Sequence, residues 1–284
     1  MKTFNTETYS RLSTIAQSIQ TGTNADTITL IDALIAFKTQ ERKPAWIREM
    51  TKLRAIIATG KPAYEIFKLD GNSKLPFAAF SSLPGVTCPG AGDCLQWCYS
   101  FKAWRYPAAF ARMAQNAHLM RTNPETIADA FNALPRTIKT VRLYVDGDFA
   151  SVRDVSFWMA QITMTSHVSV YGYSKSFTEL LAYAALGLGF PKNYILNLSG
   201  GHAHDSATVE KMKTLPITRG TFDAVSIGRK VKSTDHGKPE TNRAIRAQAG
   251  KVFPCPGKCG ACTPKGHACG SDRFRGIPIV IAVH

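Results

Sequence analysis

The sequence predicts an α/β protein whose repeated βα units form a full or partial TIM-like barrel. Two observations lead to this class. From residue 141 onward, short apolar runs recur every 25 to 29 residues, which is the length of one strand, loop, helix and return. Amphipathic segments with helix-capping residues separate these runs. Six or seven such units favour parallel strands with right-handed crossovers, and a barrel over an open sheet.

The N-terminal part of the chain is predicted to be a helical layer. Apolar side chains recur at helical spacing between Tyr9 and Ile19, between Ile31 and Ile35, and between Trp46 and Ile57. Pro44 precedes the third stripe and suits the first turn of a helix. We therefore expect a helical cap over residues 1–75 and a βα-barrel domain over residues 76–284.

Seven apolar runs in the second part are predicted strands. They cover residues 76–81, 141–145, 168–173, 194–198, 222–227, 251–253 and 277–283. Ser151 with Asp154, and Ser176 with Glu179, have the spacing of capping boxes at helix starts, and Asp205 can cap a further helix. In either architecture, functional residues belong at the C-terminal ends of the strands.

The seven cysteines fall in two tight groups after predicted strands, rather than spreading as a disulfide framework does. The first group is Cys88, Cys94 and Cys98, and the second is Cys255, Cys259, Cys262 and Cys269. Thiolates this close repel one another and oxidise readily unless a cation holds them, so we predict metal-binding loops. Ordinary buried thiols are the alternative for the first group.

The spacing of the thiols favours [4Fe-4S] clusters over zinc, because structural zinc usually takes two short knuckles with a longer spacer. Three cysteines in the first group allow a free iron, a fourth ligand from elsewhere, or a zinc with a bound water. His267 lies within the second group and is a further candidate ligand. Both groups follow strands on one rim, so we expect them to be neighbours.

Other polar residues follow the predicted strands. Asp146 and Asp148 flank a glycine after the second strand, and paired acids there can hold Mg²⁺ or act as general base and acid in a nuclease. Lys175 could pair with one of these acids or bind a phosphate. These three residues are the predicted catalytic set. The alternative is that an acid merely accepts a backbone amide or a lysine.

The fourth strand is followed by a predicted cofactor or anion nest, formed by Ser199, Gly200 and Gly201 before a helix. His202 and His204 come next and are candidates for a ligand or base, with ordinary surface histidines as the alternative. His118 is expected on a core-flanking helix face.

The positive charge is concentrated in the last quarter of the chain. The formal charge is +15, and residues 211–284 carry 14 basic and 4 acidic side chains. This localisation favours a phosphate-contacting face over a solvated surface, with DNA expected before RNA. The predicted contacts are Arg229, Lys230, Lys232, Arg243, Arg246, Lys258, Lys265 and Arg273.

Composition excludes other classes of protein. Hydrophobic residues make up 44% and charged residues 19%, which argues against long disorder. Apolar runs are far shorter than a membrane span, and the N-terminus lacks the apolar region of a secretory signal. We expect a cytoplasmic protein with no membrane partner.

Three motifs resemble the "gene product 88" family of phages and plasmids over residues 75–270: CPGxGxC from Cys88, GDF at 147–149, and YxYSKS at 171–176, followed by the terminal cysteine group. The resemblance implies a mobile genetic element and a metal-bound barrel. A cysteine loop after the first strand also resembles radical S-adenosylmethionine (SAM) enzymes. Their C-x3-C-x2-C spacing occurs here as Cys255, Cys259 and Cys262, at the other end of the chain.

The leading hypothesis is an iron–sulfur protein of a mobile element that binds nucleic acid and processes DNA. The first alternative is a radical SAM-like or redox enzyme that uses the open position of the first cysteine group. The second is a zinc-stapled DNA-binding regulator without catalytic activity.

Overall fold

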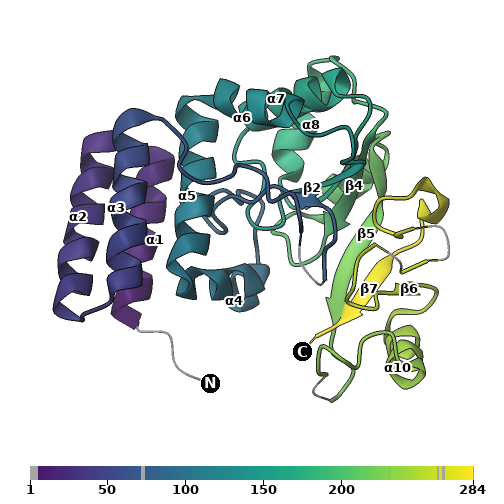
Figure 1. The fold of residues 1–284 in the computed structure, drawn as a ribbon. Coiled ribbons are helices and arrows are strands. Elements are labelled where there is room, and N and C mark those ends of the chain that lie inside the picture. The colour runs from purple at the N-terminus through teal and green to yellow at the C-terminus, as the bar shows by residue number, and fades with distance from the viewer. Residues whose placement is uncertain (1–5, 72–73, 230, 261, 264–265, 284) are drawn as a thin grey trace.

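The computed structural model describes residues 6–71, 74–229, 231–260, 262–263 and 266–283. Helices α1 (Thr6–Thr21), α2 (Asn24–Gln40) and α3 (Pro44–Thr59) stand side by side at one end of the molecule (Figure 1). All three lie where the apolar stripes predicted helices. Their buried side chains pack with Trp104, which precedes helix α5 (Pro107–Thr122), and with Phe110, which lies on that helix. The helical layer therefore meets the rest of the protein through α5.

The described residues of the second part of the chain form one seven-stranded sheet. Its strands are β1 (Ala78–Ala79), β2 (Thr140–Leu143), β3 (Ser169–Ser174), β4 (Tyr194–Ser199), β5 (Thr218–Val225), β6 (Phe253–Pro254) and β7 (Ile279–Ala282). The strand order is β1-β2-β3-β4-β5-β7-β6, and every neighbouring pair is parallel. The predicted α/β class is confirmed. In the described part of the chain no ladder joins β1 to β6, so barrel closure stays a prediction.

The strands are joined by helices. These are α6 (Pro124–Asn132), α7 (Val152–Met164), α8 (Phe177–Ala185), α9 (Ser206–Lys213) and α10 (Pro239–Ala249), with the short helices α4 (Cys94–Trp97), η1 (Tyr99–Arg105) and η2 (Asp272–Phe274) in loops. Ser151 and Asp205 cap α7 and α9 as expected, accepting from the amides of Asp154 and Thr208. Ser176 occupies the N-cap position of α8 as predicted, but its side chain makes no capping hydrogen bond, because the buried hydroxyl donates to the Phe149 carbonyl at 2.7 Å instead.

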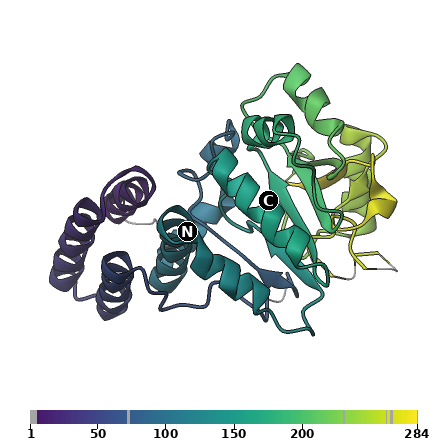
Figure 2. The ribbon, with the colours of Figure 1, turned by 90° about the horizontal axis from the view of Figure 1, so that it is seen from above.

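The two faces of the sheet have different covers. Because successive side chains of a strand point to opposite faces, Val170 and Leu196 pack against the helices, whereas Tyr171 and Ile195 face away from them. The C-terminal segment, coloured yellow in Figure 2, lies on this second face and contributes Cys269 to its apolar cluster. The segment with the second cysteine group therefore covers the face of the sheet opposite to helices α5 to α9.

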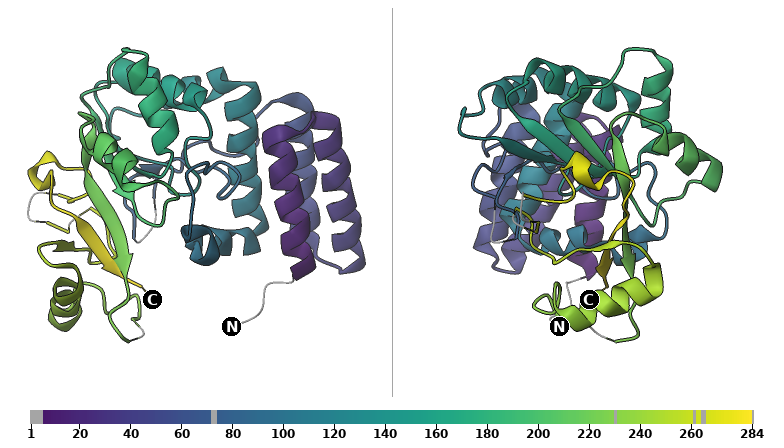
Figure 3. Two further views of the ribbon diagram at one scale, coloured as in Figure 1. Left: turned by 180° about the vertical axis from the view of Figure 1, so that it is seen from behind. Right: turned by 90° about the vertical axis from the view of Figure 1, so that its right-hand side faces the viewer.

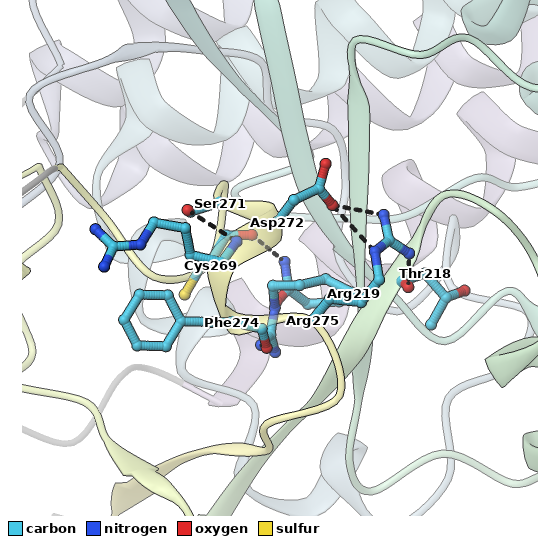
Figure 4. A network of polar contacts seen from close by, with 9 residues as sticks. Thr218, Arg219, Cys269, Ser271, Asp272, Phe274 and Arg275 are labelled. Atoms are coloured by element: carbon cyan, nitrogen blue, oxygen red, sulfur yellow. Dashed lines mark hydrogen bonds and ion pairs between the residues drawn. The ribbon is translucent and has the colours of Figure 1, made fainter.

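A buried arginine fastens this cover to the sheet. Arg219 on β5 is 1% exposed, and its guanidinium donates to the carbonyls of Phe274 and Ile277, at 2.8 Å each. Its Nε donates to Asn197 Oδ1 at 2.6 Å, and the Asn197 amide in turn donates to the Cys269 carbonyl at 2.9 Å. Figure 4 shows Arg219 among the residues of the C-terminal segment. Carbonyl acceptors thus satisfy a buried cation without a carboxylate.

Candidate functional site at the carboxyl end of the sheet

The loop that carries the first cysteine group is hydrogen-bonded to the end of β4. The amides of Gly92 and Cys94 both donate to the Gly201 carbonyl, at 3.1 and 3.2 Å, and the Ala203 amide donates to the Gly90 carbonyl at 3.0 Å. A Cβ atom at Gly201 would lie 3.0 Å from Cys94 Cβ, so glycine permits this close approach. Two features that the sequence suggested separately, the cysteine loop and the glycine turn, form one site.

In the glycine turn, the Gly200 amide already has a partner. The Gly200 amide donates to the Phe222 carbonyl at 2.9 Å, and the carboxylate of Asp223 lies close to the Gly200 Cα. The Ser199 hydroxyl accepts a hydrogen bond from the Lys175 ammonium at 2.7 Å. The edge therefore offers a carboxylate and a hydroxyl to a ligand, and the nest of amide groups stays a prediction.

Two thiols of the first group, Cys88 and Cys94, lie within electrostatic reach of Cys98 and of Lys175. Burial raises the pKa of Cys88 to about 12, the Asp148 carboxylate adds to the shift, and Lys175 opposes it. Burial also raises the pKa of Cys94, which the same ammonium lowers, while the Cys98 thiol raises both values. All seven cysteines are free thiols. Lys175 is thus a cation placed to favour the thiolate forms.

The acidic pair has structural partners. Asp148 is 4% exposed, and its two carboxylate oxygens accept from the amides of Phe149 at 2.9 Å and Lys175 at 2.6 Å. Asp146 accepts from the Ser81 hydroxyl at 3.1 Å. Burial raises the pKa of both acids. Lys175 meets Asp148 through its backbone amide, and the pair of acids braces neighbouring strand ends.

The histidines after β4 belong to the same site. His202 and His204 pack on the Phe177 ring, with ring centroids 4.8 and 4.7 Å from it. His204 Nε2 lies 2.7 Å from the Lys175 carbonyl, and because a carbonyl can only accept, Nε2 carries the proton. Burial lowers the pKa of His202. His118, predicted to flank the core, is 1% exposed on α5.

The second cysteine group follows β6, and three of its cysteines pack in one cluster with Phe253 of β6 and Ile279 of β7. Backbone amides donate to two of its sulfurs, from Gly257 to Cys255 Sγ at 3.5 Å and from Ala268 to Cys262 Sγ at 3.3 Å. Burial, and to a smaller extent the other three thiols, raise the pKa of Cys255 to about 12. The hydrogen bond from the Gly257 amide lowers this pKa. The four thiols thus share one neighbourhood.

His267 lies within the second group in sequence, but its ring is held by aromatic neighbours. The ring centroid is 4.6 Å from that of Phe77 and 4.7 Å from that of Tyr171, and the Gly270 amide donates to its Nδ1 at 3.1 Å. Its partners in the described structure are these groups rather than the thiols.

Among the described residues, no set of three or more His, Cys, Asp or Glu side chains is arranged to hold a single metal ion. The predicted metal ligands are therefore grouped by neighbourhood, but they do not form a compact single-ion cage. Metal binding stays a prediction at both groups.

Arg142 was not predicted from the sequence. It lies on β2 opposite Tyr171 of β3, whose side chain is on the sheet face that the C-terminal segment covers. Its guanidinium is 4.7 Å above the Tyr173 ring, and its buried Nε has no hydrogen-bond partner in the described structure. Burial lowers the pKa of Arg142, but Tyr99, Tyr173, Tyr171 and Cys259 raise it above the ordinary value. Tyr99 follows the first cysteine group and Cys259 belongs to the second, so Arg142 links the two. An arginine within an apolar strand run was the available signal.

Six of the eight predicted nucleic-acid contacts can be placed, and all six are exposed. They are Arg229, Lys232, Arg243, Arg246, Lys258 and Arg273, whereas Lys230 and Lys265 lie outside the described residues. Helix α10, which carries two of them, lies at the same end of the molecule as α4 in two opposite views (Figures 1 and 3). No helix in the described part is long and apolar enough to cross a membrane.

The fold and site define a parallel α/β protein with one cysteine loop at the carboxyl end of its sheet and a second over the open face. The chain belongs to the gene product 88 family, whose family model matches residues 47–275. This match confirms the family resemblance of the motifs. Neither a curated protein nor a solved structure matches the chain, and the likeness to radical SAM enzymes stays a prediction.

Proposed function

We propose that this protein binds an iron–sulfur cluster at Cys88, Cys94 and Cys98 and acts on nucleic acid with the site around it. The observation that carries the proposal is the pair of hydrogen bonds from Gly92 and Cys94 to the Gly201 carbonyl. They hold a three-thiol loop at the carboxyl end of a parallel sheet, where α/β proteins place their chemistry.

The arrangement of the thiols supports a cluster over a single zinc ion. Thiolates on one tetrahedral zinc lie about 3.8 Å apart, because each Zn–S bond is about 2.3 Å. Thiolates of a four-iron cluster bind separate irons and lie farther apart. The C-x5-C-x3-C spacing of these thiols, which lacks the two short knuckles of structural zinc, favours the second case.

When bound, such a cluster supplies an electron and an iron with an open coordination position, since only three thiolates hold it. Lys175 stabilises the negative charge of the thiolates. Its ammonium is held in place by Ser199 at 2.7 Å, and its backbone by Asp148 at 2.6 Å. Gly90 and Gly92 allow the loop to lie directly on the ends of β3 and β4. These residues position the site and exclude water from one side of it.

The second cysteine group has a different proposed role. Cys255, Cys259, Cys262 and Cys269 close over the open face of the sheet, and a [4Fe-4S] cluster or a zinc ion there would hold the C-terminal segment in place. The amide-to-sulfur hydrogen bonds at Cys255 and Cys262 are of the kind that stabilise metal-bound thiolates.

Nucleic acid is the proposed partner because the described basic residues predicted to contact it are all exposed, and α10, which carries two of them, lies in the lower half of Figure 1, as α4 does. DNA is the first substrate to test. Since Asp146 and Asp148 already accept hydrogen bonds, the proposal gives them a positioning role and leaves strand cleavage to direct assay.

A second candidate is a radical SAM-like enzyme, in which the turn from Ser199 to Gly201 holds the cofactor. The position of that turn against Cys94 and Trp97 favours it. Addition of SAM to the reduced protein tests this candidate, because binding to an open iron alters the electron paramagnetic resonance spectrum. An unchanged spectrum removes the candidate.

Anaerobic purification, followed by metal and sulfide analysis, tests the main proposal. We expect iron with an equal amount of acid-labile sulfide and a brown protein. A colourless protein with stoichiometric zinc and no sulfide would support the zinc-stapled regulator instead. DNA binding is tested separately: its affinity should fall steeply as salt rises, and a flat salt dependence removes nucleic acid as the partner.

A further inference from the structure

Four large apolar side chains are exposed within the first cysteine loop and the helices that follow it. They are Leu95, Trp97, Tyr99 and Tyr106, which are 45%, 54%, 55% and 67% exposed. Elsewhere in the described structure, the exposed large apolar residues are Met164, Leu186, Leu188 and Val283. Four of the eight exposed large apolar side chains in the described structure thus fall in one short stretch on α4, η1 and the start of α5. Such a concentration marks a binding surface.

The two aromatic side chains nearest the cysteines are held in place by the site. The Trp97 ring lies over the glycine turn, with its Cζ2 atom 3.1 Å from the position of a Gly201 Cβ. The Tyr99 hydroxyl donates to the Val145 carbonyl at 3.2 Å, which fixes the tip of that ring. Both rings are held in position before a ligand binds. Binding therefore loses little side-chain conformational entropy at these two residues.

The charges around these rings select an anionic ligand. In the sequence, Lys102 and Arg105 lie between Tyr99 and Tyr106, and both are exposed. The segment from 94 to 106 contains no acidic residue, and Asp93 directly precedes it. Neither cation has a salt bridge in the described part of the chain. Exposed aromatic rings interleaved with cations are the pattern of proteins that stack bases and contact the phosphates between them.

We infer that Trp97 and Tyr106 form a stacking platform for unpaired bases, and that Lys102 and Arg105 contact the intervening phosphates. The inference rests on the proposed function and specifies its substrate as single-stranded nucleic acid. Bases in a duplex are already stacked on each other and cannot lie on these rings without being unpaired. A strand bound here lies beside the first cysteine group, because Trp97 and Cys94 both approach Gly201.

Fluorescence anisotropy with a labelled oligodeoxythymidylate of about 16 nucleotides, matched to the size of such sites, tests the inference. Trp97→Ala and Tyr106→Ala should each weaken binding about 5- to 150-fold, which is the contribution of one stacked base. Trp97→Phe should retain most of the affinity. Leu188→Ala, at a side chain that is 67% exposed and outside the stretch, is the matched control and should bind as the wild type does.

The cation contacts have their own readout. Lys102→Gln should lower the slope of log affinity against log salt by about 1, whereas Lys213→Gln, on α9, should leave it unchanged. A labelled duplex of the same length should bind the wild type and Trp97→Ala equally, because the platform does not contact paired bases.

Several results would overturn the inference. One is that Trp97→Ala and Tyr106→Ala both bind the single strand with wild-type affinity. This result would contradict the stacking platform but not the proposed nucleic-acid partner. Loss of metal in Trp97→Ala together with full binding by Tyr106→Ala would assign the stretch a structural role. A stretch that binds a protein partner or lipid vesicles but no oligonucleotide also contradicts it. If the wild type binds no nucleic acid, the proposed partner fails, while the metal analysis still tests the cluster.

Discussion

The Lys175 amide donates a hydrogen bond of 2.6 Å to Asp148 Oδ2, and this contact joins the end of β3 to the loop after β2. The other carboxylate oxygen of Asp148 accepts from the Phe149 amide at 2.9 Å. A buried carboxylate with two amide donors is a brace. It holds Lys175 beside the thiols of the first cysteine group.

Replacement of Asp148 by Asn should destabilise the protein by about 1–3 kcal/mol, because the side-chain amide group must face one of the two backbone N–H donors. Asp129→Asn, at an exposed position on α6, is the matched control and should change the free energy of unfolding by less than about 0.5 kcal/mol. Urea denaturation measures both. Equal stability of the two variants would contradict the role of the brace.

The same variant carries a pH signature. Burial raises the pKa of Asp148 above its ordinary value of 3.8, so the folded protein holds this proton more tightly than the unfolded chain does. The contribution of Asp148 to the free energy of unfolding therefore falls as pH rises from 3.8 through the raised pKa. The wild-type stability minus that of Asp148→Asn should fall over this window. A difference that rises with pH would show that the pKa is lowered instead.

Gly90→Ala should dislodge the first cysteine loop. Its Cβ would overlap the Lys175 carbonyl and lie 2.5 Å from His204 Nε2, so the loop and the strand ends must separate. Gly187→Ala is the comparison, because that glycine has a φ of 71° but open space around it, and its substitution costs only the backbone strain of about 1–2 kcal/mol. Hydrogen exchange at Gly92, Cys94 and Ala203 should accelerate in Gly90→Ala and not in Gly187→Ala.

Arg219→Met should release the C-terminal segment from the sheet. The change leaves the carbonyls of Phe274 and Ile277 and the Asn197 side chain without their donor, and we expect a loss of about 3–5 kcal/mol or local opening of residues 268–278. Arg273→Met, at an exposed position in the same segment, should be nearly neutral. Limited proteolysis distinguishes the two, and an intact segment in Arg219→Met would contradict the account.

His118 should govern part of the stability in mild acid. Burial lowers its pKa from 6.5 to about 4, and its buried Nδ1 has no hydrogen-bond partner among the described residues. Stability is therefore fully present above pH 6.5 and is lost as pH falls toward 4, because the unfolded chain binds the proton first. His118→Phe should remove this part of the acid dependence and preserve stability at neutral pH. An unchanged pH profile would refute the assignment.

The sequence predicted the fold class well because the dominant signals were local. Apolar runs place β2, β3 and β4 within a residue or two of their observed bounds. The start of β5 at Thr218 was missed because Arg219 and Gly220 interrupt the apolar pattern, and tertiary hydrogen bonds to Arg219 compensate.

The site was predictable in its location but not in its contacts. Cys94 and Gly201 both follow strands, and parallel strands bring their carboxyl ends together, so the meeting of the two loops was implied. The partners of Ser176 and Asp148 depend on which of several donors and acceptors lies nearest in three dimensions, and sequence spacing does not contain that information. Arg142 was missed for the same reason.

The iron and acid-labile sulfide content of anaerobically purified Cys88→Ser/Cys94→Ser/Cys98→Ser, compared with that of the wild type, tests the central claim most directly. The account predicts that the triple variant stays folded, because the second cysteine group and the Arg219 contacts are unchanged, and that it loses the iron and sulfide of one cluster. Equal iron and sulfide in the wild type and the triple variant, or none in the wild type, would contradict a cluster at these three cysteines.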